Sequence, residues 1–113
     1  DIGILPILNI ALFGLFASLY LLRTDNVWGI IGIHAAWNFS QGNIYGFSVS
    51  GTGVDAAVLN FIPKSEWSWL TGGAFGAEAS VFSSLILLLA VFYLLIKMKK
   101  DGSLIELVRM GQK

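Results

Sequence analysis

The sequence predicts an all-α membrane protein with three transmembrane helices, and three observations support this class. Of the 113 residues, 56% are hydrophobic and 12% are charged, whereas a soluble domain carries about 25% charged residues. The apolar residues form blocks long enough to cross a bilayer, which takes ~20 helical residues. Only Arg23-Thr-Asp-Asn26 separates the first two blocks, so these blocks are expected to form an antiparallel hairpin.

The three predicted spans cover residues 2–22, 27–47 and 80–96. Pro6 lies near the start of the first span, where a missing N–H is tolerated. The second span is the least hydrophobic of the three. The third ends at a run of lysines that opens a tail over residues 97–113. We treat residues 1–113 as part of one membrane domain.

A long segment, residues 48–79, joins the second and third spans. It is rich in glycine but also apolar, and it contains Trp67 and Trp69. Tryptophan is enriched at the level of the lipid headgroups. We therefore expect an interfacial or partly re-entrant loop.

The basic residues predict how the chain is oriented in the membrane. Three spans place the first loop and the tail on one side, and that side carries Arg23, Lys97, Lys99, Lys100, Arg109 and Lys113. The other side carries only Lys64. The positive-inside rule then places the C-terminus in the cytoplasm.

Composition also excludes several kinds of function. The net charge is zero, which gives no sign of a nucleic-acid partner. The absence of cysteine excludes disulfides, a thiol nucleophile and a Cys-ligated metal. The chain begins with Asp1 rather than Met. We expect it to be the C-terminal part of a longer protein, with a processed or artificial start on a small protein as the alternative.

The best candidate site is a polar stripe in the second span. His34, Asn38, Gln41 and Tyr45 follow one another at i, i+4, i+7 and i+11 and so share one helical face. An ionisable side chain within the bilayer costs a few kcal/mol and usually faces the protein interior. We therefore expect His34 to face other helices or a wet cavity.

Two roles are open for His34 and Asn38. Imidazole can transfer a proton or bind a metal, and an amide can stabilise a developing oxyanion. Together they could polarise a carbonyl or hold a water molecule. Alternatively, both side chains only join helices, and such hydrogen bonds contribute ~0.6–2 kcal/mol in membranes.

Other polar residues are weaker candidates. Asn9 is expected to bond a neighbouring helix, with a place in the same cavity as the alternative. Ser83 and Ser84 are expected to bond their own helix backbone. Glu78 is expected at the N-terminus of the third span, at the outer surface and far from His34, with a catalytic carboxylate as the alternative.

The spans lack some of the side chains that peptide hydrolysis requires. No acidic residue is predicted within a span, and a single histidine cannot form a three-ligand metal site. This chain alone is therefore not expected to hold a complete hydrolytic site.

Several segments resemble the C-terminal half of the CPBP intramembrane metalloproteases, also called the Abi family. This family includes type II CAAX prenyl endopeptidases and bacteriocin-processing or immunity proteins. The sharpest likeness is an HxxxN motif, which reads His34-Ala-Ala-Trp-Asn38. Further likeness lies in residues 12–24, in Val49-Ser-Gly51 and in residues 70–78.

The resemblance implies an all-helical membrane protease, in a bacterial plasma membrane, that cleaves a peptide or protein substrate. In the family, glutamates of an EExxxR motif and the histidine of an FxxxH motif activate water. The residues matching His34 and Asn38 complete the site or stabilise the oxyanion. His34 could also bind a divalent metal such as Zn²⁺ together with ligands outside this chain.

One departure from the family pattern keeps a second function open. Both earlier motifs are absent from these 113 residues. Without them elsewhere in the protein, a non-catalytic membrane scaffold or a bacteriocin self-immunity protein becomes the alternative to an endopeptidase.

Overall fold

The fold is taken from a computed structural model that describes residues 3–62 and 65–111. Ile2 of the first predicted span, and Lys64 and Lys113 of the orientation argument, lie outside the described residues. All regular elements within the described residues are helical and none is a strand, which confirms the predicted all-α class. The long helices are α1 (Ile4–Thr24), α2 (Val27–Phe39) and α4 (Val81–Asp101).

Shorter elements fill the connections. A π-helical turn (Ser40–Ile44) continues α2, and a small helix, α3 (Ser68–Thr71), follows a single 3₁₀ turn. Two further 3₁₀ turns, Gly73–Phe75 and Ala77–Ala79, lead into α4. The tail forms α5 (Ser103–Met110).

The helix ends follow from local chemistry. Asn26 caps α2 because its side-chain oxygen accepts hydrogen bonds from the backbone N–H groups of Trp28 and Gly29. Ser80 caps α4 in the same way through the N–H of Ser83. Gly102, with a φ of 81°, ends α4 in the left-handed conformation that glycine adopts without steric cost.

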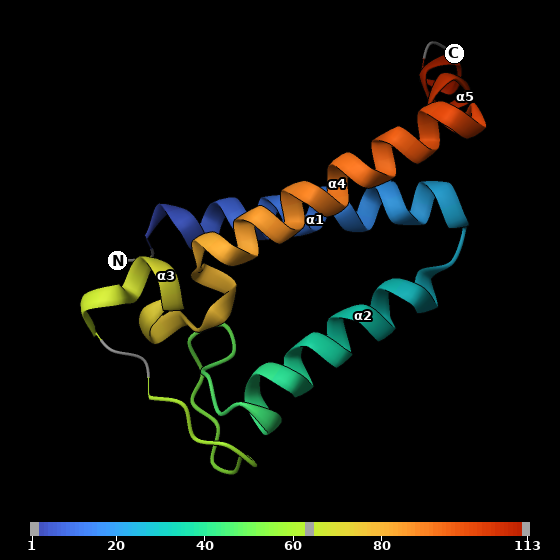
Figure 1. The fold of residues 1–113 in the computed structure, drawn as a ribbon. Coiled ribbons are helices and arrows are strands. Elements are labelled where there is room, and N and C mark those ends of the chain that lie inside the picture. Colours follow the sequence, from blue (N-terminus) through green and yellow to red (C-terminus); the bar gives the residue numbers. More distant parts are fainter. Residues whose placement is uncertain (1–2, 63–64, 112–113) are drawn as a thin grey trace.

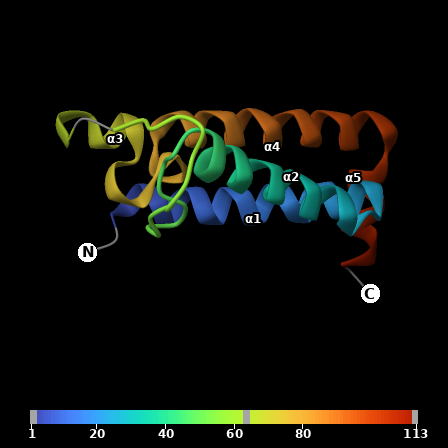
Figure 2. The same ribbon diagram turned by 90° about the horizontal axis from the view of Figure 1, so that it is seen from below.

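Helices α1 and α4 run side by side in the same direction, and α2 returns on one side of this pair at an angle to it (Figures 1 and 2). One end of the α1–α4 pair is joined by Asn9, which binds the residues around the start of α4. The other end is joined by an ion pair of 3.0 Å between Arg23 Nε and Asp101 Oδ2. The first loop and the tail therefore lie on the same side of the molecule, as predicted.

The small apolar core lies near the tail end of this pair. Met98 is fully buried and packs with Leu19, Val91 and Leu94. Leu104 and Leu107 of α5 cover this cluster. The tail therefore folds back onto α4.

Two of the three predicted spans are long and apolar enough to cross a membrane, namely α1 and α4. Only 17% and 28% of their apolar windows are buried, unlike the core helix of a soluble protein. The second predicted span is shorter, since its α-helix ends at Phe39 and a π-helical turn follows. Among the described helices, α1 and α4 are the candidate spans, and a crossing by α2 is proposed below.

The buried side chain of Asn9 generates the first prediction. Asn9→Ala removes two hydrogen bonds to backbone carbonyls and one from the Ser84 hydroxyl. We expect the free energy of unfolding to fall by ~1–2 kcal/mol, measured by thermal denaturation in detergent micelles. Ser18→Ala is the control, because its exposed hydroxyl bonds only Gly14 of its own helix. Equal destabilisation by both variants would contradict the assigned role of Asn9.

Candidate functional site

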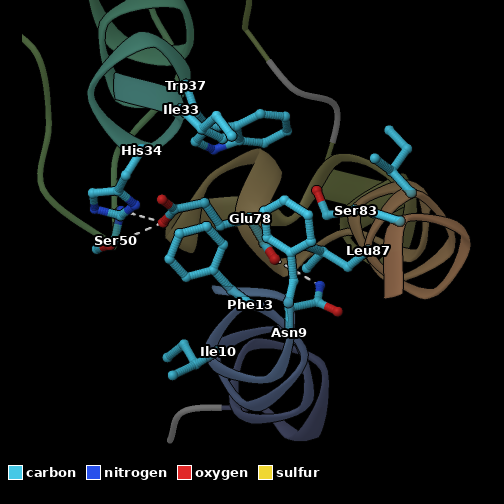
Figure 3. A pocket seen from close by; sticks show the side chains of 13 residues that line it. Asn9, Ile10, Phe13, Ile33, His34, Trp37, Ser50, Glu78, Ser83 and Leu87 are labelled. Atoms are coloured by element: carbon cyan, nitrogen blue, oxygen red, sulfur yellow. Dashed lines mark hydrogen bonds between the residues drawn. The ribbon is translucent and has the colours of Figure 1, made fainter. Parts of the chain in front are cut away.

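A cavity of about 330 Å³ lies where α1, α2 and α4 face one another (Figure 3). Most of its wall is apolar. Its apolar side chains include Ile10 and Phe13 of α1, Ile33 and Trp37 of α2, and Ile86 and Leu87 of α4. Its polar side chains are Asn9, His34, Ser50, Glu78 and Ser83. The wall thus combines an apolar surface with a few polar groups, as ligand sites commonly do.

His34 points into this cavity from α2 (Figure 3). Its ring lies against Phe13, with 5.1 Å between the ring centroids. Asn38 Nδ2 lies 3.2 Å from His34 Nε2. The i, i+4 spacing therefore brings the two side chains together, as the sequence predicts.

The contact with Asn38 determines which ring atom of His34 is engaged. In this amide orientation, Asn38 donates to Nε2, so the neutral ring carries its proton on Nδ1. The opposite amide orientation would make Nε2–H the donor to Asn38 Oδ1. In both cases Nε2 is engaged by Asn38, which leaves Nδ1 for a ligand in the cavity.

Asn38 also has polar groups that its contact with His34 leaves unbound. Its Oδ1 atom is buried and has no hydrogen-bond partner among residues 3–62 and 65–111. Its amide nitrogen carries two N–H groups, and His34 accepts one of them. Asn38 is not among the residues that line the cavity, so its contact with a ligand there runs through the His34 ring.

The predicted polar stripe does not continue past Asn38, and this expectation is corrected. The π-helical turn at Ser40–Ile44 shifts the register of the following residues. Gln41 is buried and donates to the Ser48 carbonyl at 2.5 Å. Tyr45 packs on Phe61 instead, with ring centroids 6.0 Å apart. The stripe was predicted from the α-helical period of 3.6 residues, which does not indicate a π-helical turn.

Asn9 takes both of the roles considered for it. It joins α1 to α4 and also lines the cavity. The serines differ from expectation, because Ser84 Oγ donates to Asn9 Oδ1 at 2.6 Å and its bond to its own helix is long, at 3.4 Å. Ser83 Oγ donates to the carbonyl of Ala77, just before α4.

Glu78 lies just before α4, as predicted, but its predicted separation from His34 is wrong. It was expected at the outer surface and far from His34, but both side chains line the same cavity. The cause is local folding before α4. Short helical turns carry this segment against α1, where Asn9 Nδ2 donates to the Glu78 carbonyl at 2.6 Å.

The described residues alone do not form a metal site, and the metal considered for His34 would take its other ligands from outside this chain. The cavity supplies His34 and Glu78, and no cluster of three His, Cys, Asp or Glu side chains occurs within the described ranges. A zinc site takes at least three protein ligands. No step below is therefore assigned to a metal.

A protein-family model matches the segment that contains His34 and Asn38. The family model described as type II CAAX prenyl endopeptidase Rce1-like matches residues 2–40. This stretch of the chain is Rce1-like. It covers α1, the hairpin and α2, and it contains both His34 and Asn38.

The Rce1-like match agrees with the resemblance to a fragment of the CPBP family. Together with the two apolar helices, this partial match suggests a membrane protein. No curated protein and no solved structure matches the chain. The matched residues end before Ser50 and Glu78, which the structure alone brings to the cavity.

The second prediction concerns the state of the His34 ring. Asn38→Ala removes the partner of Nε2, so we expect the neutral ring to become a mixture of two tautomers. Nitrogen-15 NMR of the histidine-labelled chain in lipid nanodiscs measures this, since His34 is the only histidine.

Asn43→Ala is the matched amide control for this measurement, because Asn43 is exposed and does not line the cavity. It should leave the ring signals of His34 unchanged. Identical signals in the wild-type chain and in Asn38→Ala would contradict the pairing.

Proposed function

We propose that this chain carries the His–Asn half of the active site of an intramembrane endopeptidase. The observation that carries the proposal is the pairing of His34 with Asn38 at the wall of a largely apolar cavity, within the Rce1-like segment. A polar pair in such a cavity suits a peptide bond that must be held away from bulk water.

The chemistry of the pair fits the stabilisation of an oxyanion. When water adds to a peptide carbonyl, negative charge develops on the carbonyl oxygen. The His34 ring, held by Asn38 through Nε2, can offer its Nδ1–H as a neutral donor to this oxygen. Such donors are fixed before the reaction and strengthen as the charge develops, and loss of one typically lowers kcat by ~100- to 1,000-fold.

The groups that activate the water are proposed to come from outside these residues. The family pattern supplies them as the EExxxR glutamates and the FxxxH histidine, on helices that would precede residue 1. No residue of α2 is buried among the residues described, so the helix has room for further helices. His34 itself is exposed at present, which is expected of a residue that faces such partners.

The membrane setting is also part of the proposal. α2 and the π-helical turn span Val27 to Ile44, ~25 Å at helical rise, and form the third crossing between α1 and α4. The excess of basic residues on the side of Arg23 and the tail supports a cytoplasmic C-terminus, and the family resemblance supports a bacterial plasma membrane. The lipid bilayer and a membrane-embedded peptide or protein substrate are the partners.

The third prediction tests the proposed function directly. In the complete protein, reconstituted in lipid vesicles with the water-activating helices present, His34→Ala and Asn38→Ala should each lower kcat for peptide cleavage by at least ~100-fold. Cleavage is measured with an internally quenched transmembrane peptide. Asn43→Ala is the control and should keep its activity.

The outcomes separate the endopeptidase from the non-catalytic alternative. Loss of cleavage with normal insertion and thermal stability supports the proposed site. Retained cleavage in both variants would overturn it. Absence of cleavage in the wild-type protein, with His34→Ala only lowering stability, would favour the membrane scaffold or self-immunity protein.

A further inference from the structure

Glu78 is the only acidic side chain among the described residues that line the His34 cavity, and the proposed function leaves it without a role. Its carboxylate accepts two hydrogen bonds on the same oxygen. The backbone N–H and the side-chain hydroxyl of Ser50 both lie 2.9 Å from Glu78 Oε2. In Figure 3 the carboxylate extends toward the side of the cavity where His34 and Ser50 lie.

Ser50 sits in an unusual backbone conformation. Its φ is 49°, in the left-handed region that residues other than glycine seldom adopt. It belongs to a tight turn in which Val49 and Thr52 exchange two backbone hydrogen bonds. Left-handed residues persist where their surroundings fix them, and the two bonds from Ser50 to Glu78 supply that restraint.

The backbone of residues 75–78 packs closely against the turn at residues 49–52. Gly51 N–H donates to the Phe75 carbonyl at 3.0 Å, beside the Glu78 contact. Gly76 has a φ of 99°, and a Cβ at that position would collide with the Ser48 carbonyl. The turn at residues 49–52 therefore rests on the backbone of residues 75–78, with Glu78 as its side-chain anchor.

We propose that Glu78 is a positioning residue for the candidate active site and that it acts through Ser50. Its carboxylate holds the 49–52 turn against the start of α4, and this turn fixes the wall of the cavity that faces His34. Asn9 holds the Glu78 backbone from the other side, so α1, the turn and α4 are fixed relative to one another. The role in catalysis rests on the proposed endopeptidase function, whereas the effect on the cavity does not.

The test compares four variants: Glu78→Ala, Glu78→Gln, Ser50→Ala and the double variant Glu78→Ala/Ser50→Ala. Glu78→Ala removes both bonds, Ser50→Ala removes only the hydroxyl bond, and Glu78→Gln keeps an acceptor oxygen without the charge. Glu106→Ala is the control, because Glu106 is an exposed acid on α5 and lines neither this cavity nor the turn.

Two measurements are made. The first is the nitrogen-15 signature of the His34 ring in the full chain in nanodiscs, with thermal stability recorded alongside. Glu78→Ala should shift the ring signals, Glu78→Gln should shift them less, and Glu106→Ala should not shift them. The second is peptide cleavage by the complete protein, where Glu78→Ala should lower kcat by ~100-fold, the cost of a small misplacement of catalytic groups, with little change in KM.

The double variant decides whether Glu78 acts through Ser50. We expect it to be no worse than Glu78→Ala alone, because both changes break the same contact. The proposal would be overturned if the kcat losses of the two single variants multiplied in the double variant. It would also be overturned if Glu78→Gln lowered kcat as much as Glu78→Ala. Unshifted His34 signals in a folded Glu78→Ala chain would overturn it as well. Shifted signals in a protein that cleaves no peptide would sustain the positioning role and reject the protease.

Discussion

The side chain of Asn9 fixes the geometry on which the cavity depends. It is 4% exposed and binds three groups of the α4 entrance: the carbonyls of Glu78 and Ser80 and the hydroxyl of Ser84. In a bilayer, apolar side chains lose little by facing lipid, so packing and hydrogen bonds between helices determine how the helices meet. Asn9 thereby sets where Glu78 stands relative to α1, and α1 carries the Phe13 ring that faces His34.

Two kinds of contact follow from this arrangement. On α2, the contact is local in sequence, since His34 and Asn38 are four residues apart on one helix. Between Ser50 and Glu78 the contact joins segments 28 residues apart and depends on the fold of the connecting loop. The first contact gives the cavity its hydrogen-bond donors. The second fixes the 49–52 turn, whose Ser50 lines the same cavity beside His34, and the proposed function needs both contacts.

The sequence was sufficient for the parts of the fold that depend on length and hydrophobicity. The spans at α1 and α4, the hairpin at residues 23–26 and the shared side of Arg23 and the tail follow from such patterns. The pairing of His34 with Asn38 follows from helical spacing alone. Each of these features is decided by neighbours along the chain.

The remaining features depend on contacts between distant residues. The π-helical turn separates Gln41 from the predicted stripe, and no local pattern in the sequence indicates where such a turn begins. Glu78 was assigned to the outer surface because the approach to α4 was treated as a simple helix start. In the structure that approach is a compact series of turns held by Asn9, with Gly76 allowing its close contact with Ser48.

The central claim is that the His34 ring, held by Asn38, binds an oxyanion, and a transition-state analogue tests it most directly. A peptide phosphonate carries the tetrahedral oxygens that a peptide substrate lacks, so groups that stabilise the oxyanion favour the phosphonate over the substrate. The account predicts that Asn38→Ala weakens phosphonate binding to the complete protein by roughly 100-fold and leaves the affinity for the uncleaved peptide nearly unchanged. Equal weakening of both ligands, or of neither, would contradict it.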